Sequence, residues 1–251
     1  MTVPMLRRFF HTPRVLMALA VRFALPLVAT IVAGCANEPM QPFDTPVTVN
    51  YLDRIDDLED GDDAILALGF RIGTWYVFND ATVGAQQMPI ATLFTTTPGG
   101  PSGTGYCVRT YGQGFASWGS GVGLDLNDPG LLPPPMTDRA AYDASAYKGI
   151  AFAARGSGLL RFEVGTSAVE TNVAGGTCLV GTTNPSCGDN HGVNIPLTSE
   201  WKQYSVPFSK LTQEGFGLRV PFDPKKVVAL YWGMPAGQPF DYWIDDVGFF
   251  R

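Results

Sequence analysis

Glycine and proline divide this chain into short segments, and that division limits its fold more than any other feature. Most of the 29 glycines and 20 prolines follow residue 50. They separate runs that are apolar or alternate between apolar and polar residues, and no stretch of ten or more keeps the helical period of 3.6 residues. We therefore expect an all-β domain, a β-sandwich or jelly roll, with helix confined to a short turn. The expected strands are residues 74–78, 106–111, 149–154, 159–164, 202–208, 227–232 and 240–249.

The first 34 residues have the features of an export signal. A basic start leads to an apolar run over residues 23–34, which is too short to span a bilayer but suits a secretory signal. Residues 32–35, Val-Ala-Gly-Cys, resemble a bacterial lipobox, in which Cys35 is acylated and becomes the first residue. Because Ala36 rather than an aspartate follows, we expect an anchor in the outer membrane. A plain signal peptide or an uncleaved anchor is the alternative.

The remaining chain divides into a tether and one domain. Residues 35–50 contain three prolines and no apolar period, so we expect a semi-extended tether, followed by a single domain over residues 51–251. Four of the 17 basic residues lie in the leader and none of the 23 acidic ones does, which leaves 13 against 23 and a net charge of −10. No basic cluster occurs, so nucleic acid is not an expected partner.

Four segments resemble a known family. Acidic, alternating segments stand at both ends of the domain, over residues 55–62 and 240–250. Residues 142–150 (Tyr-Asp-Ala-Ser-Ala-Tyr-Lys-Gly-Ile) and 201–211 (Trp-Lys-Gln-Tyr-Ser-Val-Pro-Phe-Ser-Lys-Leu) follow patterns that lead into strands. Together they resemble the galactose-binding-like jelly-roll carbohydrate-binding modules, especially family 11. That resemblance implies a β-jelly roll, structural calcium and a groove that holds glucan chains against aromatic side chains.

The two acidic ends are the candidate metal site. Leu58 occupies a ligand position of the calcium-loop pattern, which excludes a local helix-loop-helix site. A Ca²⁺ site shared by the first and last strands remains, because calcium takes several oxygen ligands. The alternative is a solvated acidic edge that deters aggregation between sheets. The candidate ligands are Asp57, Glu59, Asp245 and Asp246.

Three cysteines follow the lipobox. Cys178 and Cys187 flank a polar loop in an exported chain, so we expect a disulfide between them. Cys107 is then left as a buried free thiol, although its pairing with either of the others stays open.

The sequence carries no motif for catalysis. His191 is the only histidine after the leader, and it lacks the partners that a zinc site or an activated nucleophile needs. Glu163 and Glu170 are the nearest candidates for a glycosidase pair, but nothing marks them as paired. We expect a protein that is not an enzyme.

Aromatic residues near polar ones are the candidate sugar contacts. Sugars stack their apolar faces on Trp and Tyr, and their hydroxyls bind polar side chains at the rim. Trp75 and Tyr76 precede Asn79 and Asp80, Trp118 has glycine neighbours, and Trp243 shares a strand face with carboxylates.

These features predict a lipid-anchored, exported module that binds a carbohydrate polymer without turning it over. A structural lipoprotein that uses the same fold to bind a protein partner is the first alternative, and a glycoside-active enzyme with a hidden site is the second. A groove with tryptophan and polar side chains would favour sugar, and a flat apolar patch would favour a protein.

Overall fold

The computed structural model describes residues 43, 46–90, 93–131, 138–179 and 186–251, and Glu38–Arg251 form one compact unit. The predicted leader and the lipidation site at Cys35 lie outside the described residues. No helix in the described part of the chain is long and apolar enough to cross a membrane.

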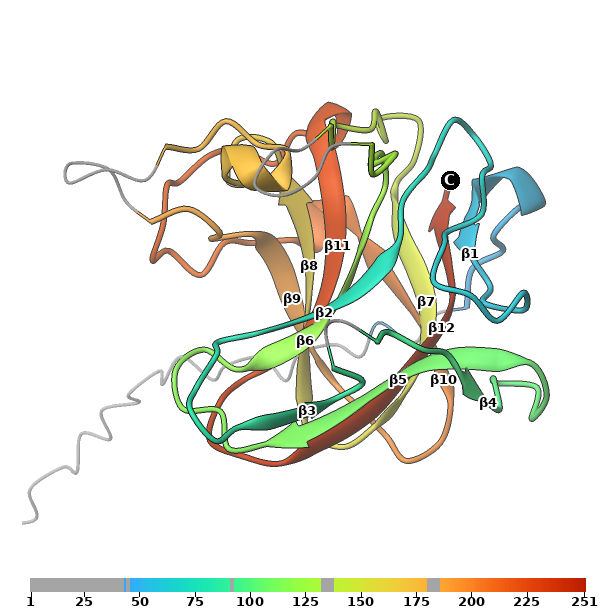
Figure 1. Ribbon diagram of the computed structural model, residues 1–251. Coiled ribbons are helices and arrows are strands. Elements are labelled where there is room, and N and C mark those ends of the chain that lie inside the picture. Colours follow the sequence, from blue (N-terminus) through green and yellow to red (C-terminus); the bar gives the residue numbers. More distant parts are fainter. Residues whose placement is uncertain (1–42, 44–45, 91–92, 132–137, 180–185) are drawn as a thin grey trace, which may run out of the picture. The chain divides into compact units, whose positions relative to one another are not determined.

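Two antiparallel sheets make up the domain, which confirms the all-β prediction (Figure 1). In the five-stranded sheet the order is β2 (Trp75–Asn79), β6 (Ser120–Asp125), β11 (Val227–Met234), β8 (Leu159–Thr166) and β9 (His191–Pro196). In the seven-stranded sheet the order is β10 (Lys202–Pro207), β7 (Gly149–Gly156), β12 (Phe240–Phe250), β5 (Tyr106–Gln113) and β3 (Gln86–Met88). Two short strands, β1 (Arg54–Asp56) and β4 (Thr97–Pro98), pair with β12 and β5.

Helix is limited to four single 3₁₀ turns among the described residues. They are η1 (Tyr51–Asp53), η2 (Asn172–Ala174), η3 (Phe208–Lys210) and η4 (Pro224–Lys226). The third overlaps residues 209–213, where the sequence predicts a short turn because Ser209 can cap it. The seven strands expected from residue 74 onward are present, and the sequence patterns missed β3, β4, β6 and β9. The acidic segment over residues 55–62 was expected to be a strand, but only its first two residues belong to one, β1.

The core forms where the inner faces of the two sheets meet. Side chains alternate along a strand, so every second residue of each strand points inward. From the five-stranded sheet, Trp75 stacks on Trp232 with ring centroids 5.2 Å apart. From the seven-stranded sheet, Phe152 meets Trp232 edge-on at 5.5 Å and Tyr204 at 5.8 Å. These rings are almost fully buried, so they link the sheets and fix which face of each sheet remains outside.

The cysteines follow the expected pairing. A disulfide joins Cys178 and Cys187, and Cys107 is free and buried in β5. Burial raises the pKa of the Cys107 thiol to about 12, and the nearby Asp245 carboxylate acts in the same direction. Cys107 therefore stays protonated at neutral pH and packs as a small apolar side chain.

Part of the expected tether packs on the domain. The Phe43 carbonyl accepts a hydrogen bond from the backbone N–H of Ser205, on the free edge of β10, over 2.6 Å. The Phe43 side chain packs against the core, and Val49 lies beside Gly248 of β12. The compact unit therefore begins before residue 51, and the chain enters it along the seven-stranded sheet.

Candidate functional site

The outer face of the five-stranded sheet carries two adjacent rows of side chains. One row crosses all five strands through Tyr76, Gly123, Tyr231, Glu163 and Gly192. The next row consists of Phe78, Gly121, Gly233, Arg161 and Asn194. Their neighbours along each strand point into the core, so these ten residues form one continuous outward surface, which we call the aromatic–glycine face.

Glycine forms the floor of the aromatic–glycine face. A Cβ atom added at Gly123 would lie 3.0 Å from the rings of both Tyr76 and Tyr231. A Cβ at Gly121 would lie 2.7 Å from the Phe78 ring, so aromatic rings lie directly over these two glycines. At Gly233 the nearest atom to an added Cβ is 3.9 Å away. The space over Gly233, in the row between Phe78 and Arg161, is therefore open.

An exposed tryptophan extends the aromatic surface. Trp118, in the loop before β6, is 56% exposed and stacks on Phe78 with ring centroids 6.0 Å apart. Phe78 in turn meets Tyr231 edge-on at 5.6 Å. Beside them, the Arg139 guanidinium lies 5.7 Å from the centroid of the Tyr76 ring. Contacts of this kind hold the rings in fixed positions, so a planar apolar ligand meets a preformed surface.

Arg161 organises the polar half of the face. Its Nε donates to Glu163 Oε1 over 2.8 Å and lies 3.3 Å from Glu214 Oε1. Its other nitrogens donate to Asn194 Oδ1 at 3.5 Å and to the Thr212 carbonyl at 3.2 Å. Burial raises the pKa of Glu163 to about 7, although Arg161 acts in the opposite direction. The result is a charged and hydrogen-bonding rim beside the open position at Gly233.

Buried carboxylates hold the two tyrosines. The Tyr231 hydroxyl donates to Glu170 Oε1 over 2.9 Å, and Asn190 Nδ2 donates to the same oxygen over 3.0 Å. The Tyr76 hydroxyl donates to Asp125 Oδ1 over 3.2 Å. Burial raises the pKa of both phenols well above the ordinary value, so they remain neutral donors.

Two of the predicted sugar contacts lie on or beside this face. Tyr76 belongs to its first row, and Trp118 covers its edge. The prediction for Trp75 was wrong, because that ring is only 2% exposed and its N–H donates to Asp56 Oδ2 inside the core over 2.7 Å. Adjacent residues of a strand point to opposite faces, so Trp75 and Tyr76 cannot serve the same surface.

The other three predicted contacts have different surroundings. Asn79 Nδ2 donates to Gln87 Oε1 over 3.1 Å. The Asp80 carboxylate accepts backbone N–H groups of Thr82, Ser117 and Gly119 and so joins two loops. Burial acts to raise the pKa of Asp80, but these hydrogen bonds and one from the Thr82 hydroxyl outweigh it and lower the pKa.

Trp243 lies on the outer face of the other sheet. Its ring stands between the guanidinium groups of Arg109 and Arg155. The structure therefore does not bring Trp243 together with Tyr76 and Trp118.

Sequence reasoning missed most of the aromatic–glycine face. Phe78, Tyr231 and Arg161 carry no motif of their own, and the register that joins their strands is not visible in a single sequence. One signal was present, because Gly119, Gly121 and Gly123 alternate through a short segment. Glycine at every second position leaves one face of a strand without side chains, which indicates a surface that something else covers.

The candidate metal ligands lie at the joined ends of the domain but do not form one cluster. In the described residues, no group of three or more His, Cys, Asp or Glu side chains is arranged to hold a metal ion. Asp57 pairs with Arg54. Asp245 is buried, its Oδ2 has no hydrogen-bond partner, and burial raises its pKa to about 8 with smaller contributions from Asp246 and Glu59.

Comparison with known structures shows which proteins share this fold. The structure is similar to the crystal structure of a family 30 carbohydrate-binding module, with a TM-score of 0.50 and 14% identity over 79% of this chain and 88% of that one. A family 11 module of a cellulosomal cellulase of Clostridium thermocellum gives a TM-score of 0.49 and 16% identity over 82% of this chain and 96% of that one. The likeness to the family 30 module shows the fold, a β-sandwich of the kind found in carbohydrate-binding modules. No curated protein matches the chain.

The family model that matches is carbohydrate binding domain 30, over residues 135–251. The matched part includes Arg161, Glu163, Asn194 and Tyr231, whereas Tyr76 and Trp118 precede it. The resemblance to carbohydrate-binding modules that the sequence indicated is confirmed for residues 135–251, and the matching model is that of family 30 rather than family 11.

Proposed function

We propose that the aromatic–glycine face binds a neutral polysaccharide chain, such as a glucan, without cleaving it. The observation that carries this proposal is the group of outward aromatic rings beside the open position over Gly233. The family match over residues 135–251 supports it, because that stretch supplies Tyr231 and the polar rim.

Each half of the face has its own part in binding. Trp118 and Phe78 offer apolar surface to the C–H faces of a sugar ring. Arg161, Glu163 and Asn194 supply donors and acceptors for hydroxyl groups next to that surface. A sugar ring placed over Gly233 meets both groups at once, since Gly233 lies between Gly121 and Arg161 in the register.

Filling the open position tests this proposal. Gly233→Val places a β-branched side chain, which a strand accepts well, into the space that the ligand needs. We expect affinity for a soluble β-glucan to fall at least tenfold in affinity electrophoresis, with little change in melting temperature. The matched control is Gln86→Val, an outward and exposed strand position on the other sheet. Equal glucan affinity in the wild type and the Gly233 variant would contradict the proposal.

Calcium is a second proposal, which the unpartnered Asp245 Oδ2 supports. Glu59 and Asp245 approach the same turn: a Cβ at Gly105 would meet the Glu59 carboxylate and one at Gly100 would meet Asp245 Oδ2. We propose that Ca²⁺ binds between these carboxylates with backbone carbonyl groups as further ligands. The cation would compensate the negative charge that is buried where the first and last strands meet.

We also propose that the mature protein is held at the outer membrane by lipid on Cys35. The lipobox and the preceding apolar run support this proposal. The module would then hold a polysaccharide at the bacterial envelope.

A further inference from the structure

A row of alternating arginine and tryptophan crosses the outer face of the seven-stranded sheet. Trp243 of β12 pairs with Arg109 of β5 and with Arg155 of β7. The two guanidinium carbons lie 4.7 and 4.3 Å from the centroid of the Trp243 ring, and Arg155 also lies 5.2 Å from the Trp201 ring. Stacked in this way, a guanidinium keeps its N–H edge available for an anion. We call these four residues the arginine–tryptophan row.

The two arginines of the row differ in charge balance. Arg109 donates to both oxygens of Asp241, over 2.9 and 2.7 Å, so its charge is neutralised. In the described part of the chain no carboxylate pairs with Arg155, and its buried Nε has no hydrogen-bond partner. A buried N–H group without an acceptor is rare in folded proteins. Arg155 therefore carries a charge that no carboxylate in the described part of the domain neutralises, and its own Nε–H is unsatisfied.

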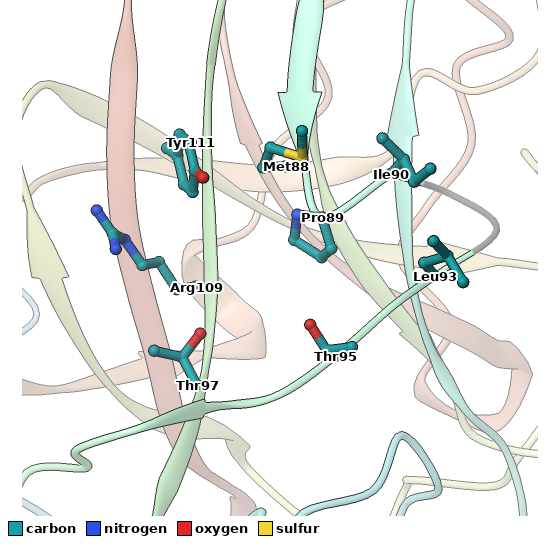
Figure 2. A pocket seen from close by; sticks show the side chains of 8 residues that line it. All are labelled: Met88, Pro89, Ile90, Leu93, Thr95, Thr97, Arg109 and Tyr111. Carbon is teal, nitrogen blue, oxygen red and sulfur yellow. The ribbon is translucent and has the colours of Figure 1, made fainter.

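An apolar hollow adjoins the row at Arg109. The hollow has a volume of about 510 Å³. Four apolar residues, Met88, Pro89, Ile90 and Leu93, line it together with Thr95, Thr97, Arg109 and Tyr111. Figure 2 shows Arg109 and Tyr111 on one side of the hollow and Ile90 and Leu93 on the other. Ile90 is 44% exposed and Leu93 is 64% exposed. Exposed apolar side chains gathered around a hollow indicate a surface that contacts another body.

The described chain enters the domain at this sheet. The Phe43 carbonyl is hydrogen-bonded to the edge strand β10 of the seven-stranded sheet. Cys35 precedes Phe43 by eight residues. Eight residues reach at most about 28 Å when fully extended. A lipid on Cys35 would therefore hold the edge of β10 within that distance of the bilayer. The aromatic–glycine face lies on the opposite side of the sandwich from the arginine–tryptophan row.

We infer that the outer face of the seven-stranded sheet docks on the phospholipid surface of the membrane. This inference rests on the proposed lipid anchor. Arg155 binds a lipid phosphate, Trp201 and Trp243 lie at the headgroup level, and Ile90 and Leu93 enter the acyl boundary. The docked domain presents the aromatic–glycine face away from the membrane, toward the polysaccharide.

The charge of the protein makes this docking dependent on the tether. The predicted mature chain has a net charge of −10, so an anionic bilayer does not attract the domain from solution. A short tether instead gives the docking face a high local concentration of lipid, and weak contacts then suffice.

Quenching of a fluorescent label by doxyl lipids in the bilayer tests the docked orientation. The chain from residue 36 carries an N-terminal hexahistidine in place of Cys35 and is held on phosphatidylethanolamine–phosphatidylglycerol vesicles by a nickel-chelating lipid. A nitrobenzoxadiazole label is placed at Ile90→Cys or, as the matched control, at Leu159→Cys, which is 39% exposed on the five-stranded sheet. Buried Cys107, with its raised pKa, does not compete for the label.

We expect doxyl lipids to quench the label at position 90 at least threefold more than the label at position 159. Arg155→Gln and Leu93→Ser should each reduce quenching at position 90. Equal quenching at the two positions, or none at position 90, would overturn the inference. If Arg155→Gln instead abolishes binding of polygalacturonate while no quenching occurs, the row is a site for an acidic sugar.

Measuring glucan affinity with the same variants distinguishes a failure of this inference from a failure of the proposed function. Arg155→Gln should leave glucan affinity unchanged. Quenching at position 90 without any glucan binding would mean that the sugar proposal fails and the docking inference stands.

Discussion

Removing Trp118 isolates the stacking contribution to sugar binding. A fully covered tryptophan buries about 250 Å², and 56% of Trp118 is exposed, so about 140 Å² is open to a ligand on that scale. A sugar ring covers one face, or about 70 Å², which is worth about 1.8 kcal/mol at about 25 cal/mol per Å². Trp118→Ala should therefore weaken glucan binding about 20-fold.

Isothermal titration with a soluble β-glucan oligosaccharide measures this change directly. The ring contacts Phe78 but lies outside the core, so we expect the midpoint of thermal unfolding to fall by only a few degrees. Phe70→Ala is the control, because Phe70 is fully exposed in another loop. A Trp118 variant that binds within twofold of the wild type would refute the stacking role. A variant that no longer folds would show that the ring is structural.

Three further predictions concern stability. Trp75→Ala should lower the free energy of unfolding by about 3–5 kcal/mol in urea, because it empties part of the core; a loss below about 1 kcal/mol would contradict the burial of the ring. If calcium binds at Asp245, excess chelator should lower the melting temperature of the wild type, and it should not affect Asp245→Asn. Burial lowers the pKa of His191, against the effect of the Val220 carbonyl. In the unfolded chain His191 takes up a proton near pH 6.5, whereas in the folded state it stays neutral to a lower pH. The free energy of unfolding therefore decreases as the pH falls below about 6.5. His191→Gln should flatten the decline in melting temperature between pH 7 and 5, and an unchanged slope would exclude His191.

The strands were predictable because their signal is local. Glycine and proline mark where strands end, and alternation marks their length, so β7, β8, β10, β11 and β12 were found within a few residues. Short strands such as β3 and β4 gave no such signal, because two or three residues cannot establish a period. Their positions depend on pairing with β5.

The site was less predictable because it depends on register. Alternation shows that Trp75 and Tyr76 face opposite ways, but it does not show which one faces the core. The hydrogen bond from Trp75 to Asp56 and its stacking on Trp232 decide this, and both partners are distant in sequence. Arg161 and Tyr231 reach the same face only because β8 pairs with β11 in one particular register.

Alternation between the core and the outer face also limits how this surface can diversify. In β11, Tyr231 and Gly233 face outward, and Leu230 and Trp232 point into the core. Removing one residue from the middle of this strand would shift part of it by one place, so that core and ligand-facing side chains exchange sides. Such a deletion would damage the sugar surface and the core together. The aromatic–glycine face can therefore change by substitution within these strands, whereas changes in length are restricted to the loops.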